Sequence, residues 1–185
     1  MRNATSPPSS THRIRIPTRS CEFAADLNAR GARVVGMVQA GQCADSSLSA
    51  ILLHNGEKLL LAQDFDPAAQ GCRLDLARLQ NAGVRIADAL AYGADLVIIN
   101  RFGKRERDGK GLSYLIERAL DADIPVVIAV GKDHFADWIK FAGGMSVKLG
   151  CDRGALDAWW HAVSAQDQDA HPIVDEHPTV CEILK

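Results

Sequence analysis

The feature that most constrains the fold is an alternation of short β-branched runs with one-sided helical patterns. The runs at 33–39, 95–100 and 124–130 are rich in Val and Ile, as buried strands are. Between them, at 76–90, apolar residues recur every three or four positions, as on a helix that buries one face. Strands that alternate with helices pair in parallel through right-handed crossovers. We therefore expect an α/β fold, a three-layer α/β sandwich with a mostly parallel central sheet.

One pair of runs departs from this alternation. The runs at 48–53 and 58–63 flank a tetrapeptide whose Asn55-Gly56 pair supplies the positive φ angles of a tight turn. We expect an antiparallel hairpin inserted in the sandwich. Similar signals predict a short strand at 12–16, a last strand at 145–149, and helices at 20–31, 112–120, 133–142 and 152–160.

The chain has 185 residues, of which 47% are hydrophobic, enough for one sizeable core. Residues 1–12 lack periodicity and predict a flexible N-terminal arm, followed by a single α/β domain at 13–165. Residues 166–185 contain two His-Pro pairs and predict a loosely attached C-terminal tail. The alternative is a homo-oligomer, in which the last helix and the tail contact a partner subunit through Ile173, Val174, Val180 and Ile183.

Charge and composition exclude several function classes. Lys and Arg number 21 against 23 Asp and Glu, so no global positive field attracts nucleic acid or anionic lipid. The apolar runs are far shorter than the ~20 residues that span a bilayer, so we expect no membrane insertion and a cytoplasmic protein. Five scattered cysteines and six histidines show no metal-ligand spacing, and no metal is predicted.

The ends of the predicted strands hold the candidate chemistry. The segment 100–111 follows a core strand and contains five cations, two acids and three glycines, which predicts a flexible cationic loop. Such a loop suits phosphate or another oxyanion, because guanidinium and ammonium groups donate charge-assisted hydrogen bonds. A merely solvated loop is the alternative. The residues expected to bind an anion are Asn100, Arg101, Gly103, Lys104 and Arg105, with Arg73, Thr18, Arg19, Ser20 and Gln39 from neighbouring element ends.

Three sequence blocks carry a resemblance. They are GADLVIINRFGKRE at 93–106, VGMVQ at 35–39 and GCRLD at 71–75. Together they resemble the bacterial family called domain of unknown function 2478, over roughly 13–163. That family has no settled activity; its members are described in connection with molybdate transport and resemble, more distantly, the thermostable nucleoside-triphosphatase group of P-loop proteins. The resemblance implies a P-loop NTPase-like fold rather than a particular reaction.

The same resemblance marks where this chain departs from the NTPase pattern. In that group the strand before Gly103 would end in acids that order Mg²⁺, within a pattern like Asp-Glu-x-Gly-x-x-Glu. Here Asn100 and Arg101 stand at the acid positions, and Gly103 and Glu106 are retained. The turn expected at 17–20 lacks the glycines and the lysine of a phosphate-cradling loop. Thr18 and Ser20 could hold an anion at the helix start, or simply cap that helix.

These observations predict a degenerate P-loop-like accessory protein that binds a nucleotide or an oxyanion, with molybdate suggested by the resemblance, and does not hydrolyse it. One alternative is a protein-interaction module that docks on a transporter or on a metalloenzyme assembly factor. The other is a weak nucleoside-triphosphatase or phosphohydrolase that uses Glu106 as the base for water. No other residue is a catalytic candidate.

Overall fold

The structure is a computed structural model, and it describes residues 18–40, 48–63, 74–144, 146–150, 152–168 and 180–184. The helices are α1 (Thr18–Ala29), α2 (Leu76–Ala91), α3 (Lys104–Arg107), α4 (Ser113–Asp121), the 3₁₀ turn η2 (Lys132–His134), α5 (Phe135–Phe141) and α6 (Arg153–Gln168). The strands are β1 (Val34–Ala40), β2 (Ser49–Leu52), β3 (Lys58–Leu60), β4 (Leu96–Phe102), β5 (Val126–Val130), β6 (Ser146–Leu149) and β7 (Val180–Leu184).

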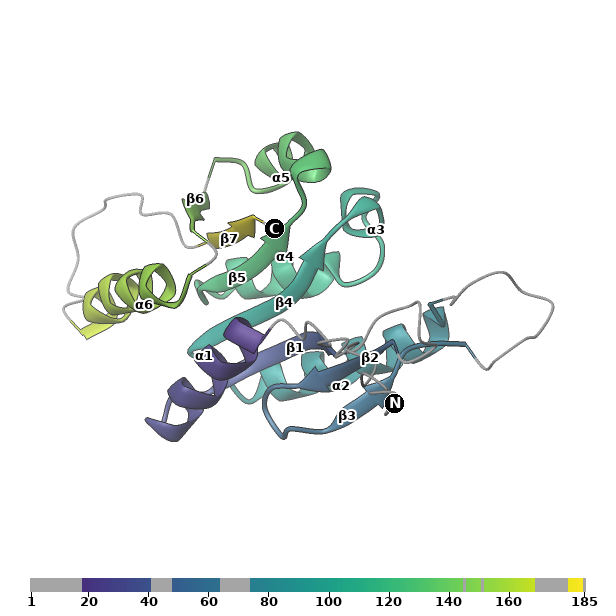
Figure 1. Cartoon of the computed structure of the whole chain (residues 1–185), viewed down its shortest axis with the longest axis horizontal. Helices are drawn as coiled ribbons and strands as arrows, with labels where there is room; N and C mark the ends of the chain where they lie inside the picture. Colours follow the sequence, from purple (N-terminus) through teal and green to yellow (C-terminus); the bar gives the residue numbers. More distant parts are fainter. Residues whose placement is uncertain are drawn as a thin grey trace, which may run out of the picture.

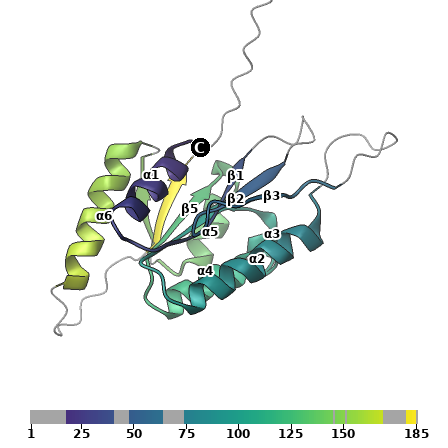
Figure 2. The same cartoon turned by 90° about the horizontal axis from the view of Figure 1, so that it is seen from below.

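The described strands form one mixed sheet in the order β3-β2-β1-β4-β5-β7-β6. Strands β1, β4, β5, β7 and β6 run parallel, and β2 and β3 add the antiparallel hairpin. Helices cover both faces of the sheet (Figures 1 and 2). The expected α/β sandwich and its hairpin are confirmed. The P-loop-like expectation is not confirmed. Its first strand, at 12–16, lies outside the described residues, and residues 18–20 of the expected turn belong to α1.

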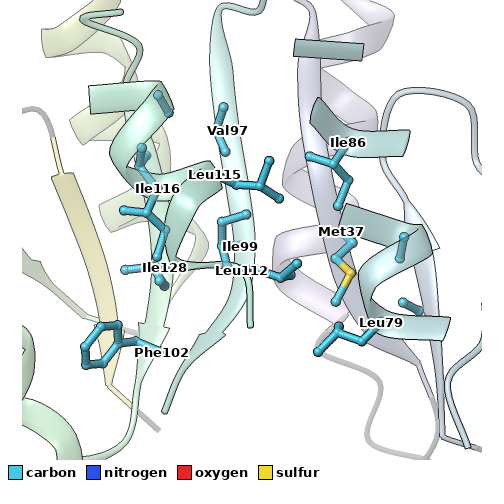
Figure 3. Close-up of a cluster of buried hydrophobic side chains, with 14 of the residues drawn as sticks. Met37, Leu79, Ile86, Val97, Ile99, Phe102, Leu112, Leu115, Ile116 and Ile128 are labelled. Carbon is cyan, nitrogen blue, oxygen red and sulfur yellow. The ribbon is translucent and has the colours of Figure 1, made fainter. Parts of the chain in front are cut away.

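One face of the sheet packs against α2, α4 and α5, and it holds the larger core (Figure 3). Alternate residues of the parallel strands point to this side, so that Met37, Val97 and Ile99 meet the apolar stripes of α2 and α4. The stripe of α2 recurs at the predicted three- and four-residue spacing, and Asp75 caps this helix by accepting hydrogen bonds from two backbone amides.

The opposite face packs against α1 and α6. Phe23 and Leu27 of α1, with Leu156 and Trp159 of α6, cover the other set of strand residues, among them Ile98. An ion pair between Arg153 and Asp26, with 2.6 Å between Nη2 and Oδ2, joins the two helices. Both faces of the central strands are therefore buried, as the Val- and Ile-rich runs predict.

Gly36 lets β1 lie against β4. Its φ is +129°, and a Cβ added there would collide with the Ile98 backbone carbonyl. A side chain at this position would push the two central strands apart, so the glycine of the VGMVQ block serves the sheet.

Two expectations are wrong in part. The segment 100–111 is not one loop: β4 continues through Phe102 and the short helix α3 follows. Phe102 is fully buried while Arg101 is exposed, and this strand-like alternation carries β4 past the predicted boundary.

The expected tail at 166–185 is also corrected. Helix α6 continues to Gln168, and residues 180–184 form β7 inside the sheet, paired with β5 and β6. The two His-Pro pairs precede this strand and do not interrupt it. The strand expected at 12–16 lies outside the described residues. Among the helices that are described, none combines the length and the apolar character needed to cross a lipid bilayer.

Candidate functional site

The carboxyl ends of β1 and β4 meet through a pair of side-chain amides. The Gln39 backbone N–H donates to Asn100 Oδ1 at 2.9 Å, and Asn100 Nδ2 donates to Gln39 Oε1 at 3.2 Å. Both residues belong to the predicted site, and the parallel pairing of β1 with β4 brings them together. The Asn100 amide is thereby engaged in joining two strand ends.

Beyond β4, the chain turns at Gly103 into α3, and Glu106 holds this turn. One Glu106 carboxylate oxygen accepts from the Gly103 backbone N–H at 3.1 Å, and the other accepts from the Leu112 N–H at 3.3 Å. Glu106 is 9% exposed, and a Cβ at Gly111 would collide with its carboxylate. A buried carboxylate that accepts two backbone amides stabilises the turn and fixes the start of both α3 and α4.

Three predicted cations surround this turn on its outer side. Arg101, Lys104 and Arg105 are all exposed. The Arg101 side chain passes over Gly103, because its Nε would lie 3.9 Å from a Cβ added there. Within the described part of the chain, neither the Arg101 nor the Arg105 guanidinium has a hydrogen bond or an ion pair. We call Arg101, Lys104 and Arg105 the carboxyl-edge cations.

Arg107, on the same short helix, differs from its neighbours. Its Nε lies 2.9 Å from Asp108 Oδ1, and its Nη1 lies 3.4 Å from Asp137 Oδ2. The hydrogen bond with Asp108 is the main cause that raises the pKa of Arg107, and the same bond lowers the pKa of Asp108. Arg107 therefore ties α3 to α5 and is not part of the carboxyl-edge cations.

The other predicted site residues come from α1 and from a segment that the structure does not describe. Because α1 ends beside the amino end of β1, its first turn lies toward the carboxyl edge of the sheet. Arg19 there is exposed but already engaged in another interaction, and Ser20 is half-buried. Thr18 begins the helix, and its side chain lies outside the description, as does Arg73.

An exposed cation that follows β5 also lies at this edge and was not among the predicted site residues. Lys132 stands two residues after Val130, which aligns with Phe102 of β4, so it lies at the same edge as the carboxyl-edge cations. The sequence offers a signal for it, since a Gly-Lys pair follows the strand predicted at 124–130. No three His, Cys, Asp or Glu side chains in the described ranges come together as a metal site.

A cavity of about 530 Å³ lies at the opposite, amino edge of the sheet. Its lining includes Arg33, His54 and Tyr92, none of which belongs to the predicted site. Arg33 donates a hydrogen bond to the Tyr92 carbonyl, and burial is the main cause that lowers the pKa of His54. The carboxyl-edge cations are thus separated from this cavity by the length of β1 and β4.

Comparison with known proteins gives two findings. A model of the family described as protein of unknown function (DUF2478) matches residues 14–159. The chain is also 37% identical over 155 residues to the molybdenum import ATP-binding protein ModC 2 of Bradyrhizobium diazoefficiens. That match covers 82% of this chain but spans only 17% of the relative's length. No solved structure matches. The extent of the family match shows that the chain belongs to the DUF2478 family.

Proposed function

We propose that this protein is an accessory module that binds an oxyanion, either a free tetrahedral anion such as molybdate or the phosphate groups of a nucleotide, without hydrolysing it. The observation that carries the proposal is the set of carboxyl-edge cations, Arg101, Lys104 and Arg105, grouped around a fixed turn. Exposed guanidinium groups without an ion-pair partner are available to donate charge-assisted hydrogen bonds.

The position of the turn supports this assignment. In open α/β sheets, ligands bind beyond the carboxyl ends of the parallel strands, and Gly103 follows the end of β4 directly. The Glu106 carboxylate and the amide pair of Gln39 with Asn100 hold the ends of β4 and β1 in place. An anion would therefore meet cations on a support that is already ordered, which lowers the entropy cost of binding.

The absence of hydrolysis is part of the proposal. Both oxygens of the Glu106 carboxylate accept backbone amides, so a role as base for water would require breaking these bonds. We therefore propose a structural role for Glu106. The expected result is no phosphate release from ATP or GTP above that of a buffer control. If the wild type releases phosphate and a folded Glu106→Gln variant does not, the result would instead favour the phosphohydrolase.

A connection with molybdenum import is proposed from the relative alone. Its name assigns molybdenum import and ATP binding to a protein of which this chain matches 17%. An accessory domain that senses the transported oxyanion, or a nucleotide, is consistent with such a partial match. The two ligand sources share the same chemistry, and the experiment below separates them.

Isothermal titration calorimetry at low ionic strength tests the proposal with molybdate, tungstate, sulfate, phosphate, ATP and GTP. We expect binding of at least one anion, weakened at least ~10-fold in a double Arg101→Ala, Arg105→Ala variant. A double Arg30→Ala, Arg118→Ala variant removes two exposed arginines elsewhere and serves as the matched control. A response to molybdate and tungstate identifies a free oxyanion site, and a response to ATP or GTP identifies a nucleotide site.

One observation favours a second candidate function. Arg101 lies near the end of β4, and Lys104 and Arg105 lie on the short helix α3. All three are exposed, and none of them lines the described cavity, which lies at the other edge of the sheet. Projecting cations also suit an acidic surface on a transporter or on an assembly factor. Titrations without heat for all six anions would contradict the first proposal and favour this interaction module.

A further inference from the structure

Strand β6 belongs to the sheet only through β7. Residues Ser146 to Leu149 pair in parallel with 180–183, and among the described strands β6 pairs with no other. Strand β7 pairs on its other side with all five residues of β5. The last described strand therefore fills an interior position between β5 and β6, which we call the β5–β6 slot.

The handedness of the crossovers says which other segment could fill this slot. The steps from β1 to β4 and from β4 to β5 move toward β6 and pass through helices on the face of α2 and α4. The step from β6 back to β7 moves the opposite way and passes through α6 on the other face. All of these steps have the same hand, as parallel crossovers almost always do.

Helix α1 lies on the same face as α6 and leads into β1 (Figure 2). A strand that precedes α1 must therefore lie on the β6 side of β1 to keep the same hand. On that side, β1 pairs directly with β4, and β4 pairs directly with β5. The first interior position left for such a strand is the β5–β6 slot. The alternative is a position outside β6. It lies two strand spacings, ~10 Å, farther from β5 than the β5–β6 slot does.

The segment just before α1 has the sequence of a strand. Within residues 12–16, Arg13 and Arg15 alternate with Ile14 and Ile16, and Pro17 alone separates this segment from the start of α1. Strand β7 has the same length as this segment, five residues, and Glu182 is its charged residue. The match to the family model begins at residue 14 and ends at 159, so it includes most of the segment 12–16 and none of β7.

We propose that the β5–β6 slot is a strand-binding site that accepts residues 12–16 of this chain as an alternative to β7. The two segments then compete for one position, and either of them holds β6 in the sheet through backbone hydrogen bonds. The inference is independent of the anion site, because it rests on strand pairing and on crossover handedness.

Hydrogen exchange of the full-length chain, followed by mass spectrometry without any ligand, tests this competition. Proline removes a backbone donor and is not tolerated in an interior strand, so Ile14→Pro disables one segment and Ile183→Pro disables the other. We expect β6 amides at 146–149 to stay protected in each single variant, because the other segment fills the slot. In the double variant their protection should fall at least ~10-fold.

Amides of β1 and β4 report whether the fold survives, and Ala4→Pro is the control for adding a proline near the amino terminus. If the double variant loses protection in β1 and β4 as well, the milder pair Ile14→Gly and Ile183→Gly repeats the cycle. Loss of β6 protection in either single variant would overturn the inference, since the remaining segment would then have failed to fill the slot. Full protection in the folded double variant would overturn it too.

Discussion

At the amino edge of the sheet, Arg33 donates to the Tyr92 carbonyl and Arg85 pairs with Glu57, whereas at the carboxyl edge Arg101 and Arg105 have no partner among the described residues. Exposed ion pairs contribute little to stability, so the unpaired arginines do not weaken the fold by comparison. The two edges differ instead in which arginines are available to bind a ligand: those of the carboxyl edge are, and those of the amino edge are already paired. The carboxyl edge is stabilised by buried side chains that neighbour these cations in sequence and lie beneath them.

The largest expected effect comes from the buried neighbour of Arg101. Phe102 is fully buried, and its ring lies 5.1 Å from that of Trp138 and 5.2 Å from that of Phe141. Phe102→Ala should lower the free energy of unfolding by about 3–5 kcal/mol, because it removes a large side chain and leaves a cavity. Chemical denaturation measures this loss. Ile139→Ala, at a side chain that is 41% exposed, should change stability by less than about 0.5 kcal/mol.

A loss below about 1 kcal/mol for Phe102→Ala would contradict the view that the carboxyl edge rests on this aromatic cluster.

The next effect concerns the carboxylate under the turn. Glu106→Ala leaves the buried N–H groups of Gly103 and Leu112 without their acceptors, and we expect a loss of about 2–3 kcal/mol in urea denaturation. Glu106→Gln keeps one carbonyl oxygen as an acceptor and should lose less. Equal stability of Glu106→Ala and the wild type would show that the turn does not depend on these bonds.

A smaller effect is expected when an arginine of each edge is replaced and the two variants are compared. Arg105→Ala removes a cation that stands beside Arg101 and Lys104, so the melting temperature should stay within about 2 °C of the wild type or rise. Arg85→Ala breaks the pair with Glu57 and should lower it slightly. Differential scanning fluorimetry measures both variants. A clear drop for Arg105→Ala would mean that this cation has a partner that stabilises the fold.

The smallest effect is a pH dependence at the amino edge. Burial, with the nearby Arg85 charge, lowers the pKa of His54 below its ordinary value of 6.5. As pH falls below 6.5, the unfolded chain takes up a proton at this position before the folded protein does. The contribution of His54 to stability is therefore complete above that pH and is lost as pH falls. Thermal unfolding between pH 5 and 7.5 should be less pH-dependent in His54→Asn, and an unchanged profile would contradict this.

Local signals explain which parts of the fold could be predicted. The hairpin turn at Asn55-Gly56 and the helix behind Asp75 depend on residues close together in sequence, and both lie where expected. Strand β7 depends on pairing with distant strands, and its own five residues carry no marker that separates a strand from a tail. Pairing partners of this kind are set by the whole sheet rather than by the segment.

The candidate site was predictable to a similar extent. Parallel pairing brings Gln39 to Asn100 as the strand-end argument expects. The role of Glu106 was harder to foresee, although its spacing from Gly103 is that of a capping box, because charge alone also suggests a base. The pairing of Arg107 with Asp137 joins residues 30 positions apart and has no local signal.

The direction of β7 has a practical consequence. Leu184 aligns with Val130, which in turn aligns with Phe102, so the described chain finishes at the same border of the sheet as Arg101. Any tether, purification tag or fused protein attached behind this strand would emerge at the same edge as the exposed guanidinium groups, two strands away from β4, and could shield them. In binding experiments, an added segment is better attached at the other terminus.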